Sequence, residues 1–239
     1  MRKADVKSLI RHAETNLEEI RIKYRKSLDI EVIDPSLRID VKNMMENLRS
    51  ALDYIAHDIY EKIIHPQRIA SGRSEIRKIH FPYGKDENSF KMSVMRNLPG
   101  LPTLSPPIFA LLEHVQPHKF GNRWLYDFCT ILNQNKHNRL SAHRRKFRLS
   151  YTIGPRGGSP VISALAGAIT APPGAIRIGG EPIFFDPNTG IPISSTGLDV
   201  QIYRWVNFIF EDTQTEVLPI LELAIKEIDQ LASKIYSII

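Results

Sequence analysis

The sequence is poor in features that would assign it to a class at once. Its 239 residues contain a single cysteine, Cys129, which excludes an internal disulfide framework and favours a reducing compartment. No apolar run reaches the length of about 18 residues that a membrane-spanning helix needs. Residues 1–20 are amphipathic and lack the apolar core of a secretion signal. We therefore expect a cytoplasmic protein with no membrane partner and with Cys129 as a buried, inert core thiol.

Signatures of common enzyme classes are also missing. There is no GxSxG nucleophile elbow, no GxxxxGK[ST] phosphate loop and no dinucleotide fingerprint. Residues 154–158 are glycine-rich but precede no helix, so we interpret them as a hairpin turn. His114 and His118 have helical ligand spacing, yet Pro117 separates them and no carboxylate is patterned with them. We expect no metal site and no cofactor.

Charge is distributed unevenly along the chain. Residues 1–150 carry 27 Lys and Arg against 17 Asp and Glu, whereas residues 151–239 carry 5 against 9. All eight histidines also precede residue 150. A basic first part can attract a polyanion such as RNA. The alternative to polyanion binding is an ordinary solvated surface with a small excess of positive charge, which has the same composition.

Apolar spacing predicts a mainly helical protein. Residues 4–28 and 37–64 repeat apolar side chains at helical intervals, and Pro35 lies in the break between them, so we expect an antiparallel helical hairpin. A polar loop is expected over residues 65–85. Further helices are predicted over residues 86–98, 105–115, 121–137 and 216–238.

The composition changes after Arg139. Residues 146–153 and 199–210 alternate and are rich in β-forming residues, and glycine and proline are frequent between them. The predicted fold class is α+β and mainly helical: an antiparallel helical bundle with a small antiparallel β subdomain inserted before the last helix. The expected boundaries are a bundle over 1–145, the β subdomain over 146–212, and a C-terminal helix over 213–239 that packs back on the bundle.

A polar row accompanies the apolar stripe of the second predicted helix. Arg49, Asp53 and His57 recur every four positions, one helical turn apart. An Asp that orients a His fixes its tautomer, as a general base requires, so these three and His137 are candidate catalytic residues. The same row also fits a structural network, in which Arg49 pairs with Asp53 and the His57 ring makes its hydrogen bonds at the surface.

A second polar cluster, residues 133–137, ends the helix predicted over 121–137. Asn133 and His137 are one turn apart, and we expect this cluster to face the row of the second helix. A buried Arg49 would need partners there, and Asn133 or Asp53 can supply them. The alternative is that these polar residues pair only to hold the two helices in register.

An acid-free basic run extends from Lys136 to Arg148. Such a cluster can neutralise phosphates, and protonated histidines would add charge at lower pH. Aromatic residues that would stack bases are few, with only Phe147 and Tyr151 nearby. A solvated junction between a helix and a strand is the alternative. The candidate ligand-binding residues are Asn133, Lys136, Arg139, His143, Arg144 and Arg145.

Several short motifs together resemble a family of uncharacterised bacterial and phage proteins. They are residues 47–53 (NLRSALD), Phe81-Pro82, Gln116-Pro117, Trp124 and residues 132–137 (LNQNKH). The family carries NLRSALDHLA, FP, QPY and LNNIDKHR in the same order and at similar spacing. The resemblance implies no activity, because the family has no established one.

The chain departs from that family near the end of the helix predicted over 121–137. Asn135 stands where the family has the Asp before Lys-His, Asn138 stands where it has Arg, and Arg139 follows one position late. Any chemistry that depends on the family's Asp and Arg would be missing in this chain.

Helical bundles with polar residues on facing helices also resemble the HEPN superfamily. Many of its members bind or cut RNA as dimers, so this resemblance implies an RNA-directed module that works as a homodimer. Its nuclease signature is an Arg, four to six residues, and a His. Arg49 and His57 are too far apart for it. Arg73 and His80 fit, but chance matches to so short a pattern are expected with 18 Arg and 8 His.

Two hypotheses from different classes follow. The first is a HEPN-like helical module that binds RNA and cleaves it only if a histidine acts as a base. The second is a non-enzymatic interaction or small-ligand-binding protein, whose polar rows merely fix the bundle.

Overall fold

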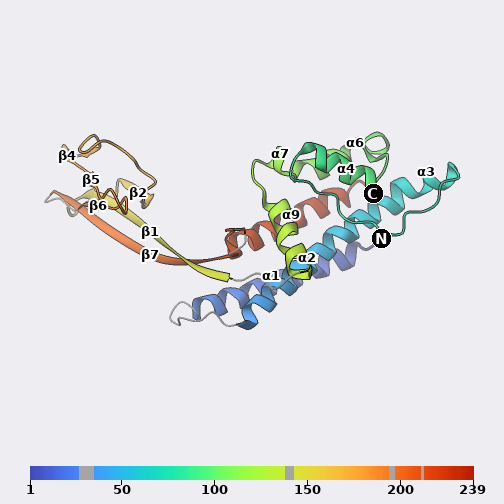
Figure 1. The fold of residues 1–239 in the computed structure, drawn as a ribbon, viewed down its shortest axis with the longest axis horizontal. Helices are drawn as coiled ribbons and strands as arrows, with labels where there is room; N and C mark the ends of the chain where they lie inside the picture. Colours follow the sequence, from blue (N-terminus) through green and yellow to red (C-terminus); the bar gives the residue numbers. More distant parts are fainter. Residues whose placement is uncertain (27–34, 138–142, 194–196, 211–212) are drawn as a thin grey trace. The chain divides into compact units, whose positions relative to one another are not determined.

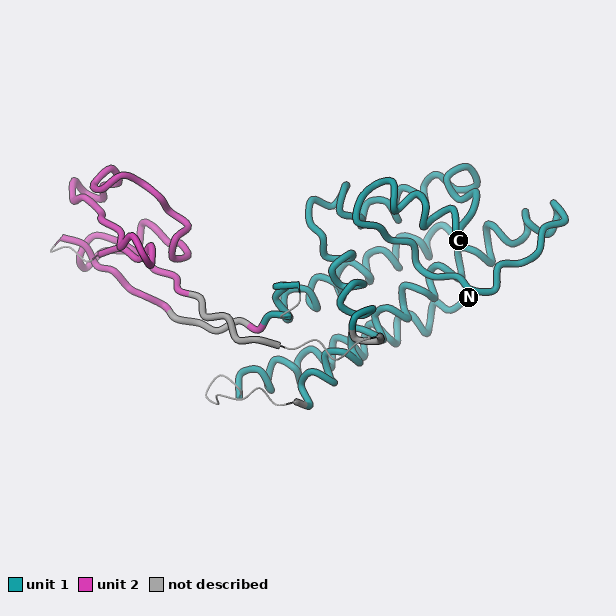
Figure 2. The backbone as a smooth tube through the Cα atoms, viewed as in Figure 1, with its two compact units in different colours: residues 1–144, 209–239 teal, residues 145–208 magenta. Residues whose placement is uncertain are grey.

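The chain folds into two compact units. The computed structural model describes the backbone of residues 1–26, 35–137, 143–193, 197–210 and 213–239, and the side chains of these except 35, 135–137, 143–148 and 204–207. Unit 1 comprises residues 1–144 and 209–239, and unit 2 comprises residues 145–208 (Figure 2). The fold is α+β and mainly helical, with a small antiparallel sheet before the last helix, which confirms the predicted fold class.

Unit 1 is built on a hairpin of two long helices, α1 (Lys3–Lys26) and α2 (Pro35–Ile59). Each helix buries one apolar side chain every three or four positions, as an amphipathic helix against a core does. The last helix, α9 (Val217–Ile235), runs along this hairpin and contacts both of its helices (Figure 1). The buried apolar residues of α1 are Val6, Ile10, Ala13, Leu17 and Ile20.

The helical path continues beyond α2 further than the sequence analysis predicts. A π-helical turn (Tyr60–Ile64) leads directly into α3 (His65–Ala70), where a polar loop was expected from residue 65. The His65 N–H donates to the Tyr60 carbonyl, five residues back. Pro66 then falls in the first turn of α3, where its missing N–H is not needed.

Five shorter helices complete the bundle. They are α4 (Glu87–Asn97), α5 (Leu101–Leu104), α6 (Pro106–His114), α7 (Pro117–Phe120) and α8 (Trp124–His137). Helix α4 begins at a capping box, in which the Asp86 carboxylate accepts from the Ser89 N–H and the Ser89 hydroxyl accepts from the Asp86 N–H. Helix α8 contacts α2 and α9, so it lies on the long hairpin.

Unit 2 contains a three-stranded sheet in the order β2-β1-β7, formed by β1 (His143–Pro155), β2 (Ile162–Leu165) and β7 (Leu198–Phe210). Strands β1 and β2 are antiparallel, with Ile153 opposite Ile162. Two smaller antiparallel pairs are β3 (Arg177–Ile178) with β4 (Glu181–Pro182), and β5 (Phe184–Phe185) with β6 (Pro192–Ile193). The core of the unit consists of Tyr151, Ile153, Ile178, Ile183 and Leu198.

A buried carboxylate joins three helices of unit 1. Asp58 of α2 is fully buried and accepts three hydrogen bonds. Its donors are the Arg2 backbone N–H (2.6 Å), the Arg2 guanidinium (3.0 Å) and the hydroxyl of Tyr236, at the end of α9 (2.8 Å). Arg2 also bonds to Glu61 at 2.7 Å. This contact ties the start of α1 and the end of α9 to the last turn of α2.

We predict that Asp58→Ala lowers the free energy of unfolding by about 3 kcal/mol, because it leaves the Tyr236 hydroxyl and two Arg2 donors without their acceptor. Urea unfolding followed by circular dichroism measures this change. Asp229→Ala removes an exposed carboxylate of α9 and is the matched control. Equal stability of the two variants would contradict the prediction.

Stability is also expected to fall at alkaline pH. Burial raises the pKa of Tyr24, and burial together with the hydrogen bond to Asp58 raises the pKa of Tyr236. An unfolded tyrosine ionises near pH 10, so above that pH the folded state holds protons that the unfolded state has lost. Each such tyrosine lowers the free energy of unfolding by about 1.4 kcal/mol per pH unit above 10. Urea midpoints at pH 8, 10 and 11 should show a shallower decline for Tyr24→Phe than for wild type.

Candidate functional site

An extended segment of unit 1, residues 76–84, is held against the bundle by side chains from three helices. We call it the clamped segment. The Asp53 carboxylate of α2 accepts the Phe81 N–H at 2.7 Å, and Arg49 donates to the Phe81 carbonyl at 3.4 Å. Because Asp53 and Arg49 are one turn apart on α2, they hold both backbone groups of one residue.

Two further amides fix the same segment from other helices. Gln116 is fully buried, and its side chain accepts the Gly84 N–H at 3.2 Å and donates to the Pro82 carbonyl at 3.3 Å. Asn97 of α4 accepts the His80 N–H at 3.0 Å. Gly84 has no room for a side chain, since a Cβ there would overlap the backbone nitrogen of Phe90. The clamped segment therefore has one defined path across the bundle.

Arg49 lies at the centre of this arrangement, with its side chain 14% exposed. Its guanidinium donates to the Cys129 sulfur at 2.9 Å and pairs with Asp53 at 3.3 Å. It also lies over the ring of Tyr83, 5.2 Å from the ring centroid. Burial lowers the pKa of Arg49, but Cys129, Asp53 and Tyr83 together raise it above its ordinary value, so the group stays charged.

Tyr83 belongs to a group of aromatic and cationic side chains at the surface of unit 1, which we call the aromatic array. Its ring lies 6.4 Å from that of Tyr126, and the Asn133 amide donates to its hydroxyl at 2.9 Å. Arg123 lies over the Tyr126 ring at 5.1 Å. Burial is the main cause that raises the pKa of Tyr83, so the hydroxyl is neutral at physiological pH. The members of the array are Arg49, Tyr83, Arg123, Tyr126 and Asn133.

Three of the residues predicted from sequence share this region. Arg49, Asp53 and Asn133 come together, because Arg49 and Asn133 both contact Tyr83 while Asp53 pairs with Arg49. Arg49 of the second helix and Asn133 of the 133–137 cluster therefore meet through Tyr83, which belongs to neither predicted cluster.

His57 lies elsewhere. It lines a pocket of about 400 Å³ with Arg2, Tyr60, Glu61 and His65, and in the described part of the chain no hydrogen bond joins it to Asp53. The second oxygen of Asp53 instead faces the Nδ1 of His80 at 3.5 Å. The catalytic roles suggested for Arg49, Asp53 and His57 stay predictions.

The remaining predicted residues lie outside what the structure describes. Arg139 is not among the described residues, and the side chains of the others are not described. Their proposed roles in catalysis or ligand binding stay predictions. These others are Lys136, His137, His143, Arg144 and Arg145.

Sequence reasoning missed the contribution of the clamped segment. Tyr83, His80 and Gln116 bear on the site, yet they lie in a predicted loop or beside a proline with no periodicity that marks them. The available signal was the pair of motifs Phe81-Pro82 and Gln116-Pro117. The two motifs contact each other in the structure, because the Gln116 side chain donates to the Pro82 carbonyl.

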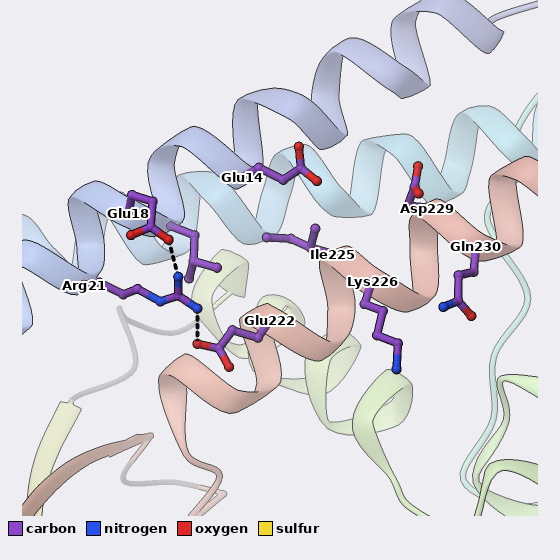
Figure 3. Close-up of a pocket in the computed structure, with 9 residues that line it drawn as sticks. Glu14, Glu18, Arg21, Glu222, Ile225, Lys226, Asp229 and Gln230 are labelled. Carbon is purple, nitrogen blue, oxygen red and sulfur yellow. Dashed lines mark hydrogen bonds and ion pairs between the residues drawn. The ribbon is translucent and has the colours of Figure 1, made fainter.

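A groove between α1 and α9 offers a different kind of surface. It has a volume of about 490 Å³ and contains none of the residues predicted from sequence. Figure 3 shows Arg21 reaching from α1 to Glu18 and to Glu222 of α9, the latter at 2.6 Å. Four carboxylates face two cations here, so the groove disfavours a polyanion. Its ionisable residues are Glu14, Glu18, Arg21, Glu222, Lys226 and Asp229.

The described histidines and carboxylates do not form a metal centre. His118 lies 3.4 Å from Glu113, whereas His114 packs against the ring of Phe120. Over the residues that the structure covers, no group of three or more His, Cys, Asp or Glu side chains could hold a metal ion. In the same residues, no helix is long and apolar enough to cross a membrane.

We predict that Asp53→Ala lowers the free energy of unfolding by about 2 kcal/mol, because the Phe81 N–H loses its acceptor and Arg49 loses a carboxylate. Asp53→Asn keeps an oxygen for the Phe81 N–H and should lose less. Asp40→Ala on the same helix removes a surface ion pair with Lys23 and is the control. Thermal melts of the three variants test this order, and an Asp53→Ala variant as stable as the control would contradict it.

Comparisons with known proteins add no family to this picture. No protein-family model, no curated protein and no solved structure matches the chain. The resemblance to the bacterial and phage family therefore rests on the motifs quoted above, and the resemblance to HEPN bundles is an analogy at the level of the fold. The function has to be argued from the geometry and charge of the residues themselves.

Proposed function

We propose that the protein is a non-enzymatic module that binds RNA. Arg49 and Asp53 would then serve as structural supports, and the basic residues of the first 150 positions would bind the phosphate backbone. The observation that carries the non-enzymatic assignment is the use of Arg49 and Asp53 to hold the backbone of Phe81, and the basic charge of residues 1–150 supports RNA as the partner.

The hydrogen bonds of Arg49 and Asp53 argue against a catalytic role. A general base needs a lone pair directed at its substrate, and an arginine that stabilises a transition state needs donors that reach the substrate. Asp53 directs one oxygen to the Phe81 N–H and to Arg49. Arg49 directs its donors to Cys129, Asp53 and Phe81. These contacts support the hypothesis that the polar row fixes the bundle.

The charge distribution favours a polyanionic partner. The surplus of ten positive charges in residues 1–150 contrasts with the surplus of four negative charges in the remainder. The acid-free run over residues 136–148 would contact phosphates through cations that no neighbouring carboxylate in the run neutralises. RNA is the polyanion that the HEPN resemblance implies, and a homodimer would double the number of phosphate contacts.

One observation favours cleavage as a second candidate function. His80 is 63% exposed, and its Nδ1 faces the Asp53 carboxylate, the arrangement that orients a histidine base. The distance from the His80 Nδ1 to the Asp53 carboxylate, 3.5 Å, is at the limit of a hydrogen bond. In this candidate function Asp53 would orient His80, in place of His57, as the base.

Fluorescence anisotropy with a labelled single-stranded RNA tests the binding. We expect Arg144→Glu combined with Arg145→Glu to weaken binding and to reduce the slope of log K against log salt by about two, one for each lost phosphate contact. Arg156→Glu combined with Arg177→Glu changes two exposed arginines outside the run, makes the same change in net charge, and should keep the wild-type slope.

Incubation of the same RNA with the protein separates binding from cleavage. We expect intact RNA from wild type and from the His80→Ala and His137→Ala variants. Cleavage by wild type that disappears in either variant would overturn the non-enzymatic assignment. Elution of wild type from RNA at low salt, with no measurable anisotropy change, would overturn RNA binding itself.

A further inference from the structure

We propose that the aromatic array binds unpaired bases of single-stranded RNA, by stacking them on the rings of Tyr83 and Tyr126. This inference rests on the proposed RNA binding and names where the bases would lie. Few aromatic residues lie near the basic run in the sequence. The fold brings two together outside the run, because Tyr83 of the clamped segment lies next to Tyr126 of α8.

The two rings have the chemistry that base stacking needs. Aromatic side chains stack any base through its π-face, and arginines beside them add cation–π attraction and charge for the phosphates. Tyr83 and Tyr126 are each only partly buried, so neither residue is fully removed from solvent. Each has an arginine over its ring, and the side chain of Arg123 is 64% exposed.

Tyr83 is held in one orientation before any ligand arrives. Its hydroxyl accepts from Asn133, and its ring lies against the buried guanidinium of Arg49. A side chain that is already ordered loses little conformational entropy on binding, so its contact adds more fully to affinity. In this arrangement Arg49 and Asn133 position Tyr83, and the two rings contact the bases.

The charge around the array suits an RNA strand. The carboxylates beside it are paired, with Asp53 at 3.3 Å from Arg49 and Asp127 at 3.3 Å from Arg123. Tyr126 and Asn133 are seven positions apart on α8, so they lie along one side of that helix. The basic run begins at position 136, less than one turn beyond Asn133.

Stacking on the array requires bases that are free to leave their neighbours. Bases in a duplex are already stacked and paired, so a duplex offers the protein only its backbone and grooves. The array therefore predicts a preference for single strands over duplexes of the same length, with tolerance of sequence.

Anisotropy titrations of labelled oligo(U) of about 12 nucleotides, and of an RNA duplex of the same length, test the proposal. We expect Tyr126→Leu to weaken oligo(U) binding roughly 5- to 150-fold and to leave duplex binding unchanged. Tyr126→Phe keeps the ring and should remain within about twofold of wild type. Tyr203→Leu removes an exposed tyrosine of unit 2 and is the control. Thermal melts establish that each variant is folded.

The outcomes separate this inference from RNA binding in general. If Tyr126→Leu binds oligo(U) like wild type while the Arg144→Glu, Arg145→Glu double variant does not, RNA binding stands and the array plays no part in it. Equal losses for Tyr126→Leu and Tyr203→Leu, or equal losses on oligo(U) and duplex, would also overturn the array. If wild type binds neither probe, the proposed function fails and the inference fails with it.

Discussion

The structure of unit 1 depends on a partly buried ion pair that holds a stretch of backbone. Arg49 and Asp53 bind the carbonyl and the N–H of Phe81, and Gln116 binds the flanking residues Pro82 and Gly84. A loop buried against helices leaves backbone groups without water, and each unpaired group destabilises the fold. Side chains from α2, α4 and the start of α7 remove that penalty. Tyr83 gains its fixed orientation from the same contacts.

The predicted helices and the fold class follow from local periodicity. The hairpin of α1 and α2, the helices α4, α6 and α8, and α9 each carry an apolar repeat that marks them in the sequence. Helices α5 and α7 have four residues each, too few to show such a repeat, and the sequence does not predict them. The pairing of Arg49 with Asp53 was among the predicted interpretations, because four-residue spacing on a helix fixes their distance. The extension through α3 was missed, because a proline ordinarily ends a helical pattern.

The tertiary contacts of the site could not be obtained in this way. Nothing in the spacing of Asp53 and His57 indicates that Asp53 would instead face His80, which comes from an irregular segment 27 positions later. The contact of Arg49 with Cys129 likewise joins residues 80 positions apart. The Phe81-Pro82 and Gln116-Pro117 motifs both lie at the clamped segment, but the sequence alone does not show that they meet. Composition and periodicity report on each element alone.

The π-helical turn between α2 and α3 has a consequence for how this chain tolerates length changes. Such a turn contains one residue more than a regular turn, bridged by the bond from the His65 N–H to the Tyr60 carbonyl. A deletion of one residue within 60–64 would restore regular helical geometry without interrupting the helical path from α2 to α3. It would leave the later residues of α3 close to their present phase around the axis, because a π-helical turn fits one additional residue into nearly the same rotation. The wide turn therefore absorbs one residue of chain length and keeps the same face of α3 toward the bundle.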